Sequence, residues 1–283
     1  MFFKLLKYDV RTGIAGRLQT FIAPAILYVL AFINYLIRVD SYTRRSGASR
    51  LGRSLGDALL FIYGGMKEYD PTVERRFIFP ALWMLVYLLL AYIVLYYPYR
   101  DIEETGQNIL IRTGGRGGWW LSKCLWSMLT VLLYCLLGWG LTLVGCVIVR
   151  IPLTMQISPN INVLFEMSGG SLLHPEKMTV EILLLPMLAM AAICLLQMTL
   201  ALFIRPVYCY MCTVAILLAG TYYMHPWLIG NYAMPLRSGR MIKNGMPAVI
   251  GCVLCTGGIV LSMAVGLARF RRYDILSREN IDD

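Results

Sequence analysis

Six apolar runs, separated by polar or glycine-punctuated stretches, organise this chain. A helix needs roughly 17–25 mainly apolar residues to cross a bilayer, and each run reaches that length. The runs cover residues 20–37, 78–97, 124–149, 182–203, 207–223 and 248–268. The pattern therefore predicts an all-α integral membrane protein with six transmembrane helices, which form a single transmembrane domain over residues 1–283.

The N-terminal residues 1–18 follow a different pattern. Apolar side chains recur at spacings of three and four with cations between them, which is typical of an amphipathic helix in the headgroup plane. The apolar positions are Phe3, Leu6, Val10 and Ile14. A secretory signal peptide would end at a small-residue cleavage site, and none follows residues 20–37. We therefore expect an interfacial helix before the first span.

Two further segments are apolar but too short or too broken to span a membrane. Residues 55–66 form an apolar island within the polar loop 38–77, which predicts an interfacial or re-entrant helix. Residues 225–247 contain Pro226, Gly230 and Pro235, which interrupt any long helix. We expect this second segment to be re-entrant, dipping into the outer side of the membrane before the last span.

Composition argues against a soluble domain. The chain is 58% hydrophobic and 15% charged over 283 residues, with a mean hydropathy of +0.64, which is far more apolar than a globular domain. The formal net charge is +10, but the basic residues flank apolar runs, where cations bind lipid headgroups. Membrane lipid is therefore an expected partner, and nucleic acid is not, because the basic residues form no continuous patch.

The cysteines predict neither disulfides nor a metal site. All eight lie inside the predicted spans, where they act as small apolar side chains. Two Cys-x-x-Cys pairs, Cys209 with Cys212 and Cys252 with Cys255, carry enough thiols for one zinc ion. In the six-span topology the two pairs lie near opposite ends of their helices, so we expect no bound metal.

Six spans place both termini on one side of the membrane, and the Lys and Arg residues indicate which side. With cytosolic termini, thirteen of them fall inside and thirteen outside, but eight of the outer ones lie in loop 38–77. Without this loop, which also carries five acids, the count is thirteen against five. We expect a multi-pass protein of the cytoplasmic (inner or plasma) membrane with both termini cytosolic.

The sequence contains no pattern for catalysis. A glycine-rich phosphate loop, a His-Glu-x-x-His zinc motif and a Gly-x-Ser-x-Gly elbow are all absent, so we expect no enzymatic activity in this chain. The central parts of the spans contain no Asp, Glu, Lys or Arg, whereas ion-coupled carriers need buried ionisable groups. Neutral polar residues such as Gln197, Thr199 and Thr213 are expected to hydrogen-bond between helices. Energy for any transport would then come from another subunit.

The segment 98–123 is charged and glycine-punctuated between two long apolar runs. Acids follow Pro98, where they favour the start of a helix, and Gly106 would end it soon after. The segment therefore predicts either a short surface helix or a solvated cytosolic loop.

The order of residues in this segment resembles the first cytosolic loop of ABC-2 type ABC transporter permeases. The matching positions are Glu103, Glu104, Gly106, Leu110, Arg112, Thr113, Arg116 and Lys123. The N-terminal amphipathic helix, the six spans, the re-entrant segment WLIGNYAM and the tail at 274–276 extend the likeness along the chain. Gly114 departs from the family pattern, which has proline after the threonine.

The resemblance implies a permease subunit that pairs with a second one, as a homodimer or heterodimer, and docks on a cytosolic ATP-binding subunit. That partner, rather than this chain, would hold ATP and magnesium. The resemblance assigns the coupling contact to Asp101, Ile102, Glu103, Glu104, Thr105, Gly106, Leu110 and Arg112. It assigns the outer gate to Trp227, Leu228, Ile229, Asn231 and Tyr232. The cargo would be an amphiphile, such as a peptide, lipid or drug, which is exported between two copies along the first, second and fifth spans.

Small residues at four-residue spacing in the last span form a ridge that permits close helix packing. They are Gly258, Ser262 and Gly266.

The alternative function is a structural or sensory membrane protein, in which the charged loop docks a cytosolic partner without transport.

Overall fold

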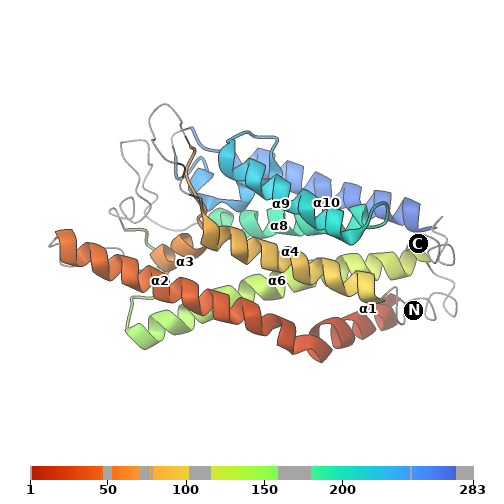
Figure 1. Ribbon diagram of the computed structural model, residues 1–283, viewed down its shortest axis with the longest axis horizontal. Coiled ribbons are helices and arrows are strands. Elements are labelled where there is room, and N and C mark those ends of the chain that lie inside the picture. Colours follow the sequence, from red (N-terminus) through yellow and green to blue (C-terminus); the bar gives the residue numbers. More distant parts are fainter. Residues whose placement is uncertain are drawn as a thin grey trace.

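The computed structural model describes residues 2–46, 53–69, 77, 79–101, 116–158, 180–242 and 244–271 (Figure 1). Within these ranges the protein is built from helices, with one isolated bridge between Ser238 and Met246. The long helices are α2 (Ile22–Ser46), α4 (Ala81–Asp101), α6 (Arg116–Val149), α8 (Val180–Leu200), α9 (Pro206–Tyr222) and α10 (Ala248–Arg271). The short elements are α1 (Phe2–Asp9), η1 (Val10–Ile14), η2 (Ala15–Phe21), α3 (Leu55–Tyr63), η4 (Ile229–Ala233) and η5 (Pro235–Arg237).

Five of these helices are long and apolar enough to cross a membrane, namely α2, α4, α6, α8 and α10. The prediction of an all-helical, multi-pass membrane protein is thereby confirmed. The apolar helix α9 has 17 residues and is shorter than the other five. Six crossings therefore stay a prediction. At about 1.5 Å per residue, α6 is roughly 50 Å long, which exceeds the ~30 Å hydrocarbon core of a bilayer.

The long helices lie side by side in one bundle (Figure 1). Helix α8 contacts α4, α6, α9 and α10. In its most apolar stretch 72% of residues are buried, against 22% in α10. Helix α8 is therefore the centre of the bundle, and α10 lies at its periphery. The start of α1, the start of α6 and the end of α10 share one end of the bundle, because Gly118 lies near Leu5 and the Trp119 ring stacks on Phe270.

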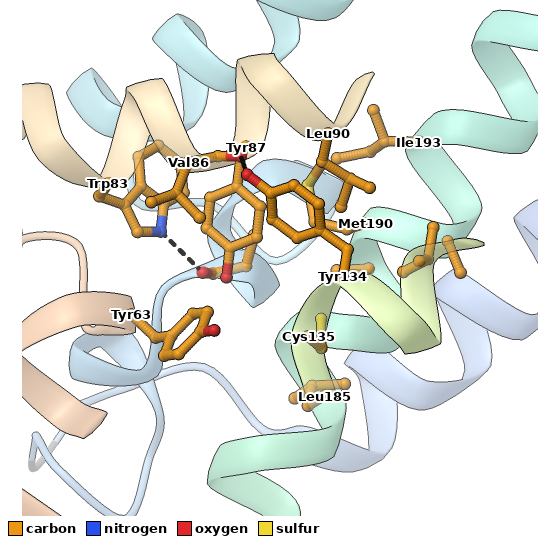
Figure 2. Close-up of a cluster of buried hydrophobic side chains, with 14 of the residues drawn as sticks. Tyr63, Trp83, Val86, Tyr87, Leu90, Tyr134, Cys135, Leu185, Met190 and Ile193 are labelled. Carbon is orange, nitrogen blue, oxygen red and sulfur yellow. Dashed lines mark hydrogen bonds between the residues drawn. The ribbon is translucent and has the colours of Figure 1, made fainter. Parts of the chain in front are cut away.

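Aromatic side chains fill the core where α3, α4 and α6 meet (Figure 2). Tyr63, Tyr87 and Tyr134 each expose 5% or less of their surface. A buried aromatic hydroxyl or indole N–H usually has a hydrogen-bond partner. Tyr134 accordingly donates to the Val86 carbonyl at 2.7 Å, and the Trp83 indole donates to the Ala233 carbonyl at 2.9 Å. The core is thus a packed aromatic layer that also holds the segment 225–247 against α4.

Helix α3 corresponds to the apolar island, and nearly all of its residues are buried. Its first N–H groups have no partner within the helix, so other groups satisfy them. The Ser54 hydroxyl accepts from the Asp57 N–H at 3.0 Å, and the Leu55 N–H donates to the Pro152 carbonyl at 3.1 Å. The Asp57 carboxylate accepts two hydrogen bonds from Ser158. Residues 151–158 therefore act as the N-terminal cap of α3.

The N-terminal residues differ from the single amphipathic helix expected over 1–18. Helix α1 ends at Asp9, a π-helical turn follows, and η2 contains non-helical backbone angles at Arg17 (φ −132°, ψ 37°). Helix α1 also contacts α6, and Asp9 is buried with 2% exposure. One face of α1 is therefore covered by α6 and does not lie against lipid headgroups. That face carries Asp9, which the apolar periodicity did not include.

Candidate functional site

Helical residues occupy both ends of the predicted loop 98–123. Pro98 lies inside α4, Asp101 is the last residue of that helix, and α6 begins at Arg116. The expectation that Pro98 and Asp101 mark the start of a new helix is wrong, because α4 continues through the proline into its last turn. Residues 102–115, which connect the two helices, lie outside the described ranges.

One lysine joins three helices at this end of the bundle. Lys123, near the start of α6, has a fully buried side chain. Its Nζ atom lies 2.5 Å from Asp9 Oδ1 in α1 and 2.6 Å from Asp101 Oδ2 in α4. Both carboxylates are 3% exposed. The ammonium of α6 therefore bridges the end of α1 and the end of α4.

Polar and aromatic neighbours surround this bridge. The Ser122 hydroxyl donates to Asp9 Oδ2 at 2.5 Å, and the Tyr97 hydroxyl donates to Asp9 Oδ1 at 3.0 Å. The Lys123 Nζ atom lies 4.5 Å from the ring centroid of Tyr97 and 4.9 Å from that of Trp119, which adds cation–π attraction. We define the Lys123 cluster as Asp9, Tyr97, Asp101, Ser122 and Lys123.

The charges of the Lys123 cluster explain why it holds the helices together. A buried charge that loses its partner has neither water nor a counterion, and removing one member of such a pair costs about 3–5 kcal/mol. Lys123 is shared by two carboxylates, so moving α1 or α4 away from α6 would separate opposite charges in an apolar environment. The cluster therefore fixes the ends of α1, α4 and α6 relative to one another.

The structure places only one of the predicted coupling residues. Asp101 is buried and ion-paired with Lys123, so its carboxylate faces the protein interior. The other coupling residues lie outside the described ranges: Ile102, Glu103, Glu104, Thr105, Gly106, Leu110 and Arg112. Their contact with an ATP-binding subunit stays a prediction. No sequence pattern predicted a role for Asp9, although it is the only acid in the first 39 residues.

At the opposite end of the bundle, the segment 225–247 packs among α8, α9 and α10. Of the predicted outer-gate residues, Trp227 is 73% exposed, Leu228 and Ile229 are half-buried, and Asn231 and Tyr232 are buried. The Asn231 amide donates to the His225 carbonyl at 3.0 Å, and the Tyr232 hydroxyl donates to the Pro226 carbonyl at 2.9 Å. The segment is thus folded on itself, with Trp227 on its surface.

Arg237 is the buried centre of this segment, and its side chain is 0% exposed. Its guanidinium donates to carbonyls at the end of α9 and to carbonyls that follow α3, as well as to the Asn231 side chain. The carbonyl acceptors belong to Gly220, Thr221 and Tyr223 near the end of α9 and to Met66 and Lys67 after α3. One side chain therefore ties α9, α3 and η5 together.

The environment of Arg237 suits a cation. The last carbonyls of a helix carry partial negative charge and lack partners within the helix, and a guanidinium is a planar five-donor group that can reach several of them. Burial lowers the pKa of the Arg237 guanidinium to about 10, and the carboxylate of Glu68 opposes that shift. The side chain is therefore charged at neutral pH. The sequence did not predict that Arg237 binds these carbonyls, because a single arginine in an interrupted apolar segment matches no motif.

The three small residues of α10 face neighbouring helices. Gly258 lies near Ala192 of α8, and Ser262 accepts at its carbonyl a hydrogen bond of 3.0 Å from the Thr199 hydroxyl. A Cβ atom on Gly266 would overlap the Trp120 indole ring of α6. Glycine at that position allows the ring to lie directly on the backbone of α10.

Three neutral polar residues of the spans, Gln197, Thr199 and Thr213, connect helices, as expected. The Gln197 amide donates to the Ala91 carbonyl of α4 at 3.2 Å, and the Thr213 hydroxyl donates to Gln197 Oε1 at 2.6 Å. Helices α4, α8 and α9 are therefore joined by one polar chain. Among the residues that the structure describes, no three His, Cys, Asp or Glu side chains lie close enough to hold a metal ion.

Comparisons of the chain with protein-family models, with curated proteins and with solved structures find no match. The likeness to ABC-2 permeases therefore depends on the residues of segment 98–123 and on the order of elements along the chain.

Proposed function

We propose that this chain is the transmembrane subunit of an ATP-driven ABC exporter and moves an amphiphilic cargo across the cytoplasmic membrane. The observation that carries the proposal is the buried Asp101–Lys123 pair, which joins the end of α4 to the start of α6 inside the protein. In the sequence, residues 102–115 connect these two helix ends. A partner that moved this segment would therefore act on two long apolar helices together.

In this proposal the residues 102–112 contact a cytosolic ATP-binding subunit. Glu103 and Glu104 supply negative charge for that contact, and Gly106 permits a turn before Leu110. Asp101 has a different role, because its carboxyl group holds Lys123. An external motor is needed because the chain has no phosphate loop and its span centres contain no ionisable residue.

The cargo path in this proposal lies between two permease subunits, with α9 as a sixth crossing and with both termini cytosolic. Support comes from the core of the bundle, where the side chains of Tyr63, Tyr87 and Tyr134 are buried against one another (Figure 2). A path through the middle of one subunit would have to break this aromatic layer. An apolar route between subunits suits an amphiphile better than an ion.

The test uses the double variant Glu103→Ala/Glu104→Ala in membranes that also contain the ATP-binding partner. We expect normal insertion, loss of cargo-stimulated ATP hydrolysis and loss of transport. Asp282→Ala/Asp283→Ala is the matched control, because it removes two acids from the C-terminal tail. Unchanged transport by the Glu103/Glu104 variant would refute the coupling role. A chain that binds a cytosolic protein but never moves a solute would instead support the structural or sensory alternative.

A further inference from the structure

The N-terminal residues 2–21 are held at one end and irregular at the other. Asp9, the last residue of α1, is fixed by Lys123, Ser122 and Tyr97. The π-helical and 3-10 turns that follow end in α2, and Arg17 between them has non-helical backbone angles. Short stretches of π or 3-10 winding within a helical segment often mark hinges. The segment thus has a fixed point at Asp9 and a bend at Arg17.

A second contact holds the same segment. Gly13, in the π-helical turn, is buried against α4 and α6. A Cβ atom at this position would lie 2.6 Å from the Trp126 indole nitrogen and 2.8 Å from Tyr97 Cζ, which is closer than real Cβ contacts. The backbone of the N-terminal segment therefore touches the Tyr97 ring of the Lys123 cluster and the Trp126 ring beside it, so two adjacent turns pack on α4 and α6.

Beyond the bend the chain enters α2, and the Arg17 guanidinium lies 5.6 Å from the ring centroid of Tyr97. The backbone of residues 10–21 therefore connects Asp9 of the Lys123 cluster to the start of α2. Any shift of Asp9 with Lys123 would pull on the bend at Arg17 and hence on the start of α2. The same shift would move Asp101 and the end of α4.

We infer that Lys123 is a positioning residue that makes the N-terminal segment 2–21 and the ends of α4 and α6 move as one unit, so that a displacement of α4 and α6 reaches α2. We call the two ion pairs of Lys123 the junction, and each pair can be removed by its own substitution. The Asp9 half attaches α1 to α6, and the Asp101 half attaches α4 to α6. The force that would drive such a displacement rests on the proposed function, whereas the junction itself does not.

Hydrogen–deuterium exchange of the full chain in lipid nanodiscs tests the junction without any partner. Asp9→Asn removes the charge on α1 and keeps the shape of the side chain. We expect exchange in peptides from residues 2–21 to rise about tenfold, with little change in peptides from residues 94–101. Asp101→Asn is expected to give the reverse pattern, and Lys123→Met to raise exchange in both regions. Lys7→Met, which removes an exposed lysine of α1, is the control and should change neither.

Two results would overturn the inference. One is unchanged exchange of residues 2–21 in Asp9→Asn, and the other is a uniform rise that includes α8 and α10, which would indicate only a loss of fold. A functional arm then measures transport and basal ATP hydrolysis with the ATP-binding partner present. Asp9→Asn should keep partner binding and basal hydrolysis but lower transport several-fold. If no ATPase binds the chain, the proposed function fails, and the exchange pattern still decides the junction.

Discussion

Replacing Arg237 with Met tests whether one buried cation holds the segment 225–247 in place. Methionine fills a similar length of side chain but donates no hydrogen bond, so the carbonyls of Gly220 and Thr221 and the Asn231 side chain lose their partner. The α9 carbonyls lie at a helix end, where no intrahelical donor can replace the guanidinium. The variant should therefore loosen the contact between η5 and α9.

The size of the effect follows from the six hydrogen bonds of the guanidinium, two of which share one N–H because the group has five. Each bond to a charged group contributes about 1.5–3 kcal/mol, and a plain sum would equal or exceed the whole stability of a typical domain, about 5–15 kcal/mol. The six bonds share one side chain and are not additive. Removing one member of a buried charge network costs about 3–5 kcal/mol, so we expect about 4 kcal/mol for Arg237→Met.

The assay is thermal unfolding of the purified chain in detergent, followed by tryptophan fluorescence. At about 2–4 °C per kcal/mol for a chain of this size class, the midpoint of Arg237→Met should fall by roughly 10 °C. Arg237→Lys keeps the charge but has three donors, and should lose about half as much. Arg240→Met, at an exposed position three residues away, is the matched control. A midpoint for Arg237→Met within about 2 °C of this control would refute the account.

Three further changes have defined outcomes in the same assay. Burial raises the pKa of Asp57 above 3.8, and hydrogen bonds from Ser158 oppose that shift. Because the folded protein then holds the proton more tightly than the unfolded chain, the free energy of unfolding falls as the pH rises from about 4 through the folded-state pKa. The unfolding midpoint of Asp57→Asn should therefore equal or exceed that of the wild type at pH 8, and the difference should shrink toward pH 4. A variant that is less stable than the wild type at pH 8 and regains stability relative to it at pH 4 would contradict this. Gly266→Leu should push the Trp120 ring off α10 and cost about 1–3 kcal/mol, and an unchanged midpoint would show that the ring is not seated there. Tyr134→Phe should cost about 1 kcal/mol by leaving the Val86 carbonyl without its donor, whereas an equal loss in Tyr92→Phe, at an exposed tyrosine of α4, would remove the hydrogen bond as the cause.

The apolar runs predicted the long helices well, because hydrophobic length alone decides whether a helix can cross a bilayer. Helix ends were harder to predict. Residues 116–123 contain two glycines and two cations, which favour a loop, but the stacking of Trp119 on Phe270 and the burial of Lys123 hold them in α6. Pro98 suggested a break, yet a proline in the last turn of α4 removes only one hydrogen bond. These outcomes depend on partners that are distant in sequence.

The buried charges could not be predicted for the same reason. Lys123 was predicted to be the last residue of the cytosolic loop 98–123. Its two carboxylate partners, Asp9 and Asp101, precede it by 114 and 22 positions in the sequence. Arg237 finds its acceptors in backbone carbonyls, which every residue has. Asp9 alone left a signal, as a single acid among the cations of an apolar N-terminal segment. An isolated ionisable residue near a predicted span is therefore worth treating as one half of a buried pair.

The most direct test of the central claim is native mass spectrometry of the full chain, purified by affinity from its own membrane in a mild detergent. We predict a particle with two permease subunits and one ATP-hydrolysing subunit for each of them. The ATP-hydrolysing subunits should dissociate in Glu103→Ala/Glu104→Ala and stay bound in Asp282→Ala/Asp283→Ala. A chain that purifies without any ATP-hydrolysing subunit, or whose complex is unaffected by the Glu103/Glu104 change, would contradict the proposal that ATP hydrolysis drives this protein through the segment 102–115.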